Sequence, residues 1–535
     1  MAVAVAVDFL REGRTSELWQ RCCGFVDLDI EQFMTIQYQL LLEQIELLKN
    51  CELGKTLMRG NNPQSVEEFR EQVPITTYAD YAPYLLEQNE NVLPEKPILW
   101  QHTSGRSGEY RFKKVPVTRR QYDDLGDAFL GVFILASCKD RGDVIIEEHD
   151  KLFYGLAPPP YISGSYLRRV AEMDLFNFLP PIDDAEAMTF EERTQQGLMM
   201  GMSEGIDILP GITSVLVAIG DRFSQGGGLG RIKSVMKRPR ALPRLLKALI
   251  KSRIAGRPIL PKDIWSIKAL IAGGADNGIY RERIKEMWGK YPLDIYGCGE
   301  GVIMAMQTWD YDGMTFLPHL NFLEFMPLDE WAKWSANQAR RPRLLMLNEV
   351  QEDESYAIVI TSFRGGAFVR YFLGDVIKIT SLRNKTLNIQ TPQMTFDARI
   401  DGIIDIAGFT RLTEKSLWQA LENSGIAYEE WTARKEQQED KPILHMYIEP
   451  KIGTEISEQQ VAAVIHEELK KLDSDYADLE TILNLRPLKV TALPVGSFNN
   501  YIVKQQAAGA DLAHLKPPHI NPAAVAVDTL LTPVS

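Results

Sequence analysis

The stretch from residue 266 to residue 301 alternates between strand-like and helix-like patterns, and each strand-like run ends in glycine. SIKALIAGGA (266–275) predicts a strand, NGIYRERIKEMWGKY (277–291) a helix, and LDIYGCGEG (293–301) a second strand that runs into a turn. Short strand–helix–strand units of this kind build parallel sheets, which bind ligands beyond the carboxyl ends of their strands. We therefore predict an α/β protein with a ligand site near these glycine turns.

The length of 535 residues is more than one hydrophobic core normally supports. Strand-like runs at 321–327, 355–362 and 375–381 predict a β-rich portion that follows the alternating unit. After residue 400 the pattern changes to a helix near Thr413, a strand at 443–450 and a polar helix at 457–472. We predict a large, multi-subdomain N-terminal α/β domain over residues 1–400 and a smaller α+β domain over residues 401–535.

Four further segments give local predictions. Helical spacing of apolar residues predicts one helix from Asp27 to a glycine cap at Gly54. VIIEE (144–148) predicts a strand, and the proline-rich APPPYISGSY (157–166) predicts an irregular loop. The tail after Pro517 is predicted to be loosely ordered.

Composition narrows the cellular setting. The formal charge of −13 argues against non-specific binding to nucleic acid. The five cysteines are an odd number without metal-binding spacing, which argues against a disulfide framework or a zinc site and favours a reducing cytoplasm. The N-terminal apolar run is too short for a signal peptide, and no run is long enough to span a membrane.

Residues 231–257 stand out against this acidic background, because they hold ten Lys or Arg and no acid. The pattern fits a solvated helical face. It also fits a docking site for an anionic carrier protein, a coenzyme phosphate or a membrane surface. The sequence leaves these alternatives open.

Three glycine-containing segments carry groups suited to nucleotide chemistry. HTSGRSG (102–108) offers backbone N–H groups, hydroxyls and an arginine for phosphate oxygens. In IYGCGEG, Glu300 follows a glycine turn at a strand end and is placed to hold Mg²⁺ on a triphosphate. In RYFLGD, Asp375 is placed to accept two hydrogen bonds from a ribose diol. Each segment alone is equally compatible with an ordinary turn.

The order of the segments is more specific than any one of them. TSGRSG, GGA, YGCGEG, RYFLGD and ARID follow one another as in the acyl-adenylate-forming superfamily of acyl-CoA synthetases, peptide-synthetase adenylation domains and luciferases. Within it, the chain resembles the Gretchen Hagen auxin-responsive promoter family of acyl-acid amido synthetases. The segments that carry this resemblance are ELWQRCCGF, FMTIQYQLLLEQIELL, VPITTYADYAPYL, FLEF and GSF…LKPPH. The likeness extends over nearly the whole chain.

The resemblance implies a role for each motif residue. It places the nucleotide phosphates at Ser104, Gly105, Arg106, Ser107 and Gly108, and the adenine between Gly273, Gly274 and Ala275 on one side and Tyr296 and Gly297 on the other. It assigns Mg²⁺ to Glu300, the ribose to Asp375, and a hinge to Arg399 and Asp401. Lys516, from the second domain, reaches the phosphates and joins Arg106 as a catalytic cation.

The implied activity uses ATP and Mg²⁺ and has two half-reactions. A small-molecule carboxylic acid attacks ATP to form acyl-AMP, and the acyl group then passes to an amine, which the likeness suggests is an amino acid. One alternative acceptor is a thiol of coenzyme A or of a carrier protein docked at 231–257. A second alternative is a non-catalytic protein that binds an acyl group or a nucleotide.

Three departures from the family pattern bear on these alternatives. Arg106 stands where the phosphate loop usually has Ser or Thr, Gly299 stands where Ser or Thr usually precedes the glutamate, and Phe372 stands where Arg usually precedes the glycine. A lost hydroxyl near Mg²⁺ and an added cation near phosphate predict either altered nucleotide handling or adenylation that is weak or lost.

Overall fold

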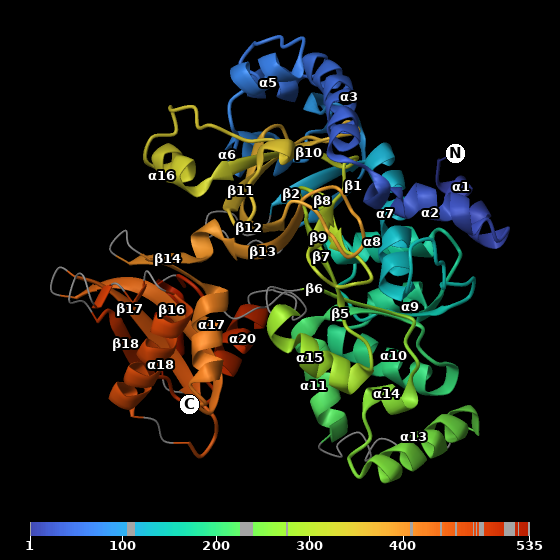
Figure 1. The fold of residues 1–535 in the computed structure, drawn as a ribbon, viewed down its shortest axis with the longest axis vertical. Coiled ribbons are helices and arrows are strands. Elements are labelled where there is room, and N and C mark those ends of the chain that lie inside the picture. The colour runs from blue at the N-terminus through green and yellow to red at the C-terminus, as the bar shows by residue number, and fades with distance from the viewer. Residues whose placement is uncertain are drawn as a thin grey trace. The chain divides into compact units, whose positions relative to one another are not determined.

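The structure is a computed structural model of the whole chain. It describes all residues except 1, 104–112, 225–238, 274–276, 407–409, 439–440, 455–456, 474–475, 478, 481–485, 508–518, 523 and 533–535. The chain divides into two compact units (Figure 1), the first mainly from residues up to Phe396 and the second mainly from Asp397 onward. The short stretch Gly374–Val376 belongs to the second unit.

The first unit mixes helices with a large sheet. Its helices are α1 (Ala2–Arg11), α2 (Thr15–Cys23), α3 (Ile30–Lys49), α4 (Glu52–Leu57), α5 (Val66–Gln72), α6 (Tyr78–Leu85), α7 (Arg119–Ser137), α8 (Ile162–Ala171), α9 (Ile182–Ala187), α10 (Phe190–Glu204), α11 (Thr213–Ser224), α13 (Leu242–Ala255), α14 (Pro261–Ile264), α15 (Asn277–Trp288) and α16 (Leu328–Ala336). Short 3₁₀ helices are η1 (Gly24–Asp27), η2 (Glu90–Val92), η3 (Pro239–Ala241) and η4 (Leu347–Glu349).

The strands of this unit form a two-stranded ribbon and a mixed sheet. The ribbon is β1 (Pro97–His102) with β2 (Lys114–Thr118). The sheet contains β3 (Lys151–Phe153), β4 (Asn177–Leu179), β5 (Ile208–Ile212), β6 (Ala269–Gly273), β7 (Leu293–Cys298), β8 (Val302–Gln307), β9 (Met314–Phe316), β10 (Asn321–Pro327), β11 (Ser355–Ser362), β12 (Tyr371–Ser381) and β13 (Gln393–Arg399). Among the described residues its order is β10-β11-β12-β13-β9-β8-β7-β6-β5-β3-β4.

The sheet changes character at β7. On one side, β6 runs parallel to β7, and β5, β3 and β4 continue the parallel half. On the other side, β8 is antiparallel to β7 and begins the antiparallel half. The predicted strand–helix–strand unit over 266–301 is confirmed as β6, α15 and β7. Its second glycine turn therefore lies at the carboxyl end of the last parallel strand.

Helix α7 explains how the parallel half is held. Its N-cap Thr118 accepts a hydrogen bond from the backbone N–H of Gln121, and its remaining turns bury apolar side chains on nearly every face. Phe133 and Leu130 lie in the same core cluster as Leu152, Ile208 and other strand residues. Helices that are apolar all round are covered on all sides, so α7 anchors this half of the sheet.

Two predictions need correction, one of a helix and one of a loop. The predicted helix over 27–54 is two helices: Asp29 caps α3 by accepting from Gln32 N, α3 ends at Lys49, and Gly54 lies inside α4 rather than at a cap. The predicted loop 157–166 is wrong in its second half, because Ile162 begins α8. Gly164 is needed there, since a Cβ would lie 2.1 Å from the carbonyl carbon of Pro158.

VIIEE (144–148) forms no strand, although its β-branched residues favoured one. The ammonium of Lys268 explains the difference. It donates to the carbonyl of Ile145 and to the carboxylates of Glu147 and Asp150, at 3.4, 2.6 and 2.8 Å. Lys268 thus binds one backbone carbonyl and one carboxylate of the segment, and no residue of 144–148 joins a strand ladder.

The second unit is a smaller α+β fold. It contains η5 (Ile400–Gly402), β14 (Ile403–Ile406), β15 (Thr410–Thr413), α17 (Glu414–Asn423), β16 (Tyr428–Gln438), β17 (Lys441–Pro450), α18 (Glu458–Leu472), β18 (Leu488–Ala492), α20 (Ser497–Ala507) and α21 (Ala524–Leu531). β17 pairs antiparallel with β16 and parallel with β18, and α17 and α18 contribute to the core on this sheet.

The tail of this unit is more regular than predicted. α21 buries Val527 and Leu530 against Phe498 and Leu493. This apolar packing orders part of a tail that was predicted to be loosely ordered. In the described part of the chain, no helix combines the length and apolar character needed to cross a bilayer.

Candidate active site

Three predicted adenine-site residues lie on the neighbouring parallel strands β6 and β7: Gly273 ends β6, and Tyr296 and Gly297 lie toward the carboxyl end of β7. Ile271 pairs with Leu293 and Ala272 with Asp294, so Gly273 lies beside the residues that lead to Tyr296 and Gly297. Tyr296 is buried, and its ring centroid lies 6.0 Å from that of Phe396. At Gly297 a Cβ would lie 2.2 Å from the carbonyl oxygen of Val302, so the β7–β8 turn admits only glycine.

Glu300 occupies the turn itself and is buried. Its Oε1 accepts hydrogen bonds from the Lys113 ammonium and from the Tyr371 hydroxyl, each at 3.1 Å. Lys113 also donates to the Tyr371 oxygen at 3.0 Å. Burial raises the pKa of Tyr371, and the neighbouring Glu300 carboxylate raises it further. The phenol therefore stays protonated and donates to the carboxylate.

Lys113 was missed by the sequence reasoning. Its ammonium lies over the rings of Tyr78 and Tyr371, 5.4 and 5.7 Å from their centroids. It reaches Glu300 from a position 187 residues earlier in the chain. The available signal was the pair of lysines at 113–114, which four residues separate from the glycine- and serine-rich segment HTSGRSG, since a cation near that segment can neutralise a phosphate it binds.

Asp375 and Arg399 form an ion pair, with Nη1 of Arg399 at 3.2 Å from Oδ1 of Asp375. The Asp375 side chain is 8% exposed and that of Arg399 is 43% exposed. Gly374 precedes the aspartate with φ +76°, a backbone conformation that favours glycine. An ion pair thus links Asp375, the predicted ribose-binding residue, to Arg399, a predicted hinge residue.

Three motifs that carried the resemblance meet in a buried polar network. The Arg370 guanidinium donates to both carboxylate oxygens of Glu324 at 2.9 Å, which links RYFLGD to FLEF. The Thr76 hydroxyl and the Tyr81 hydroxyl both contact the backbone of Val369, which links VPITTYADYAPYL to the same strand. These motifs therefore build the scaffold that positions Tyr371.

The other predicted site residues lie outside the described residues. They are Ser104, Gly105, Arg106, Ser107, Gly108, Gly274, Ala275 and Lys516. The side chain of the predicted hinge residue Asp401 is also outside them.

Gly299 has a local explanation in the packing of the turn. A Cβ at this position would lie 2.4 Å from Cγ2 of Thr103, at the end of the β1 segment. The preceding residue, Cys298, accepts a hydrogen bond from Gly301 N through its sulfur at 3.2 Å, so it acts as a turn residue. Glycine at position 299, where the family usually has Ser or Thr, thus leaves room for the methyl group of Thr103.

This packing predicts a compensating pair. Gly299→Ser is expected to lower the free energy of unfolding by about 1–3 kcal/mol, because it overpacks the turn. Adding Thr103→Ser removes the opposing methyl and is expected to recover most of that loss. Chemical denaturation of wild type, both single variants and the double variant measures the coupling. A double variant no more stable than Gly299→Ser would contradict the contact.

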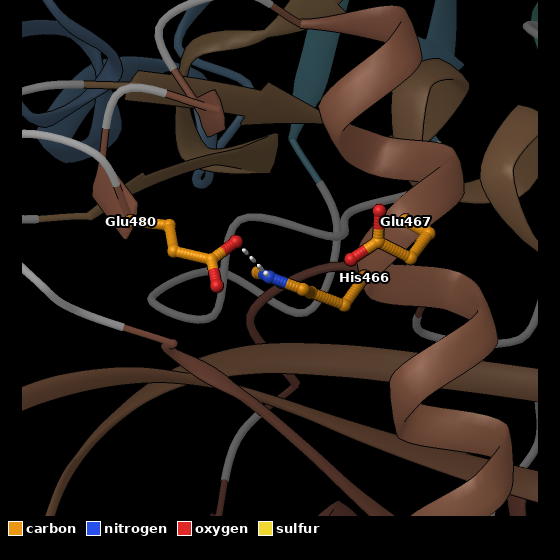
Figure 2. A group of neighbouring side chains, drawn as sticks. All are labelled: His466, Glu467 and Glu480. Carbon is orange, nitrogen blue, oxygen red and sulfur yellow. Dashed lines mark hydrogen bonds and ion pairs between the residues drawn. The ribbon is translucent and has the colours of Figure 1, made fainter.

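One group in the second unit has metal-ligating residue types. His466, Glu467 and Glu480 have ligand atoms within 4.8 Å of one another. Figure 2 shows His466 pointing at Glu480, with Glu467 on the next position of α18. The Glu480 carboxylate also accepts from Lys470 at 2.8 Å and from Arg486 at 2.6 Å, and Lys470 contributes most to lowering its pKa to about 2. Two cations already neutralise this carboxylate, so the group is an ion-pair network.

Three family models match the chain. They are the GH3 family N-terminal domain over residues 24–142, the GH3 family central domain over 314–399 and the GH3 family C-terminal domain over 413–523. Together they cover more than half of the chain.

Curated relatives match over shorter stretches. A jasmonoyl–L-amino acid synthetase, GH3.5 from Oryza sativa subsp. japonica, is 26% identical over 263 residues, which are 45% of this chain and 44% of that protein. The jasmonoyl–L-amino acid synthetase JAR4 from Nicotiana attenuata is 33% identical over 149 residues, 27% of this chain and 24% of that protein. The alignments thus span less than half the length of these relatives.

Solved structures match over nearly the whole chain. AtGH3.15 acyl acid amido synthetase, solved with 2,4-DB, has a TM-score of 0.66 at 16% identity and covers 95% of each chain. A 2-hydroxyisobutyryl-CoA ligase in its postadenylation state has a TM-score of 0.59 at 15% identity, covering 94% of this chain and 91% of that one. The likeness confirms the predicted fold, a large N-terminal α/β domain with a smaller C-terminal one.

Proposed function

The chain belongs to the GH3 family, and from that premise we propose that it is an ATP-dependent ligase that adenylates a carboxylic acid and joins the acyl group to the amine of an amino acid. The observation that carries the proposal is the buried Glu300 carboxylate. It lies at the carboxyl end of the last parallel strand and is held between Lys113 and Tyr371. Ligands bind at that edge in open α/β sheets.

The residues at Glu300 fit a magnesium ion. Its carboxylate supplies the hard oxygen ligand that Mg²⁺ prefers. Between described residues, both hydrogen bonds to this carboxylate engage Oε1, which leaves Oε2 to serve as a ligand atom. When bound, Mg²⁺ would neutralise charge on the phosphates of ATP.

In the first half-reaction, a carboxylate oxygen of the acid bonds to the α-phosphorus of ATP, and the bond from that phosphorus to the pyrophosphate oxygen breaks. Lys113 holds a positive charge beside Glu300 and is placed to move toward the phosphates as negative charge shifts to pyrophosphate. We extend the same role to Arg106 and Lys516. Asp375 accepts from the ribose hydroxyls, and Gly273, Tyr296 and Gly297 border the adenine.

In the second half-reaction, the neutral amine attacks the acyl carbon of acyl-AMP, AMP leaves, and the amine proton passes to a base or to water. We propose that the second unit rotates between the two steps, with the hinge at Arg399 and Asp401, to admit the amine and exclude water. The division of the chain into two compact units supports this proposal.

The five cysteines, all free, support a reducing cytoplasm as the setting.

Acid-dependent exchange of pyrophosphate into ATP tests the first half-reaction. We expect exchange with at least one acid from a panel that includes jasmonic acid, indole-3-acetic acid and 2,4-DB, the acids that relatives' names carry. Exchange no faster than that of the Glu300→Ala variant with every acid would favour a non-catalytic binder.

Mass analysis of products tests the acceptor. Incubation with ATP, the active acid and either a mixture of amino acids or coenzyme A is expected to give an amide with the amino acids. A thioester as the only product would favour coenzyme A or a carrier protein as acceptor, and would make residues 231–257 the first surface to test for carrier docking.

A further inference from the structure

Helix α13 has two apolar faces, and only one of them is covered. Leu245 and Ala248 are buried in the core beside Met202 and Trp265. On the opposite face Leu246, Leu249, Ile250 and Ile254 are 58%, 47%, 60% and 83% exposed. In Figure 1 the helix lies at the edge of the first unit. Spacings of three, one and four residues place these four side chains on one stripe.

Such clustering is unusual on this molecule. Elsewhere in the described chain, no single helix or strand has more than two large exposed apolar side chains, and a few such side chains are normal on a protein surface. Four of them within nine residues form a continuous patch, and patches of that kind mark binding surfaces.

Cations flank and interrupt the apolar stripe. Lys247 and Lys251 follow one another along one side of the helix, and Arg253 lies within the stripe; all three are exposed. None of the ion pairs found between described residues involves them. In sequence, the surrounding segment 231–257 has ten Lys or Arg and no acid, although the chain carries −13 overall.

The cationic side of α13 borders a polar cleft. Lys247 and Lys251 line a cavity of about 340 Å³ at the amino-terminal ends of β3, β5 and β6, whose charged wall also includes Lys151, Arg244, Glu204, Asp207 and Asp263. This is the end of the strands opposite to Glu300. The cationic side of α13 therefore lies away from the proposed active site.

From these observations we propose that α13 binds the surface of an anionic phospholipid membrane, with its four aliphatic side chains in the acyl boundary and its lysines on headgroup phosphates. An amphipathic helix with aliphatic residues on one face and cations on its flank binds lipid in this way. Each lysine gains attraction to the negative surface, and the gain weakens with salt.

Other occupants fit the face less well. A second copy of the chain would bring two identical cationic segments together in a two-fold interface, because each copy presents the same patch. A protein partner typically meets aromatic anchors, whereas this stripe consists of Leu and Ile, which are under-represented or neutral among interface hot spots. The charge is also of one sign throughout, which matches a lipid surface better than a patterned protein surface.

Co-sedimentation of the full chain with vesicles tests the proposal. Vesicles of phosphatidylcholine mixed with phosphatidylserine are expected to pellet the protein, and vesicles of phosphatidylcholine alone are not. Ile250→Ser with Ile254→Ser is expected to weaken binding at least tenfold, because two aliphatic side chains no longer leave water. Lys247→Gln with Lys251→Gln is expected to weaken it about 30-fold, at roughly fivefold for each charge.

Matched variants elsewhere separate this face from general surface effects. Ile452→Ser removes an aliphatic side chain that is 88% exposed in the second unit, and Lys55→Gln with Lys385→Gln removes two exposed charges. Both are expected to bind the mixed vesicles like wild type. All variants are expected to keep the wild-type thermal unfolding midpoint and pyrophosphate exchange rate, so failure of the proposed ligase function would not affect this test.

Three results would overturn the proposal. They are no binding of wild type to the mixed vesicles, equal binding by the Ile250→Ser, Ile254→Ser variant, and binding that persists unchanged in high salt. Sedimentation velocity tests the alternative that a second copy of the chain binds the stripe. A wild-type dimer that Ile254→Ser dissociates would make the stripe an interface between copies instead.

Discussion

Replacing Glu300 with glutamine is expected to slow acid-dependent pyrophosphate exchange by about 10²–10³-fold, the range found when one preorganised electrostatic contact is removed. Glutamine keeps the size of the side chain, and its amide oxygen can still accept from Lys113 and Tyr371. What is lost is the negative charge that would hold Mg²⁺. The loss should therefore appear in the rate of exchange and in the dependence of that rate on Mg²⁺ concentration, with little change in unfolding.

Glu324 provides the matched control, since it is also a buried carboxylate held by cations. It accepts from Arg370 at 2.9 Å and from Arg70 at 3.1 Å. Glu324→Gln leaves those arginines without a counter-charge and is expected to cost about 3–5 kcal/mol of stability, as broken buried ion pairs do. We therefore expect Glu300→Gln to lower the rate of pyrophosphate exchange, and Glu324→Gln to lower the free energy of unfolding in denaturant.

Lys113→Gln extends the test to the second member of the site. If Lys113 and Glu300 act together, the fold-decrease in exchange rate of the double variant will be smaller than the product of the fold-decreases of the two single variants. Glu300→Gln exchanging at the wild-type rate would contradict the assignment of Glu300 as the metal residue. A fall in unfolding midpoint as large as that of Glu324→Gln would show that Glu300 is structural.

Glycine turns made part of this site predictable. Because Gly273 ends β6, the turn after β7 contains Gly299 and Gly301, and the two strands are parallel neighbours, both turns were expected at the same edge of the sheet. The contact between Lys113 and Glu300 could not be found in the same way, because it joins residues 187 positions apart and depends on how the β1–β2 ribbon lies beside the sheet. Sequence order alone gives no such distance.

The same limit explains the local errors. The run VIIEE has strand-forming residues but forms no strand, and Lys268, just before β6, donates to its Ile145 carbonyl and its Glu147 carboxylate. Tertiary contacts override intrinsic strand preference in this way. Gly164 shows the reverse case: glycine usually disfavours a helix, yet α8 requires it here because the backbone of Pro158 leaves no room for a Cβ.

His519 in the second unit carries the other large expected effect. It is buried between two carboxylates, with Nδ1 at 2.6 Å from Glu414 Oε1 and Nε2 at 2.7 Å from Glu430 Oε1. Its ring stacks on Trp431, with ring centroids 4.7 Å apart. Burial lowers the pKa of His519, but the two carboxylates outweigh it and raise the pKa to about 9. The folded unit therefore holds an imidazolium at neutral pH.

The sign of the resulting pH dependence follows from linkage. The folded pKa of about 9 lies above the ordinary value of 6.5, so folding takes up a proton between these values. The stabilisation is complete below pH 6.5 and is lost as pH rises through 9. Its size is about 3–4 kcal/mol, from roughly 1.4 kcal/mol for each pH unit of difference. Hydrogen exchange of peptides from β16, which carries Glu430, measures it locally.

Two variants isolate the imidazolium. His519→Gln is expected to lower the protection of β16 near neutral pH and to remove its decline between pH 6.5 and 9. His445→Gln is the matched control: His445 is also buried and bonded to a carboxylate, Glu436, but burial lowers its pKa. That variant should keep the wild-type decline. Flat protection of wild-type β16 across this range would contradict the charged state of His519.

The position of His519 gives this stability effect a functional consequence. Ala433 on β16 donates its N–H to the carbonyl of His519 and accepts from Asn521 N, so the segment that follows Lys516 by three residues is fixed to the edge of the sheet. The proposed role of Lys516 in adenylation needs that attachment, because a lysine on an unattached segment loses its preorganisation. His519→Gln should therefore also slow pyrophosphate exchange at neutral pH. Exchange at the wild-type rate together with reduced protection of β16 would show that Lys516 acts without this support.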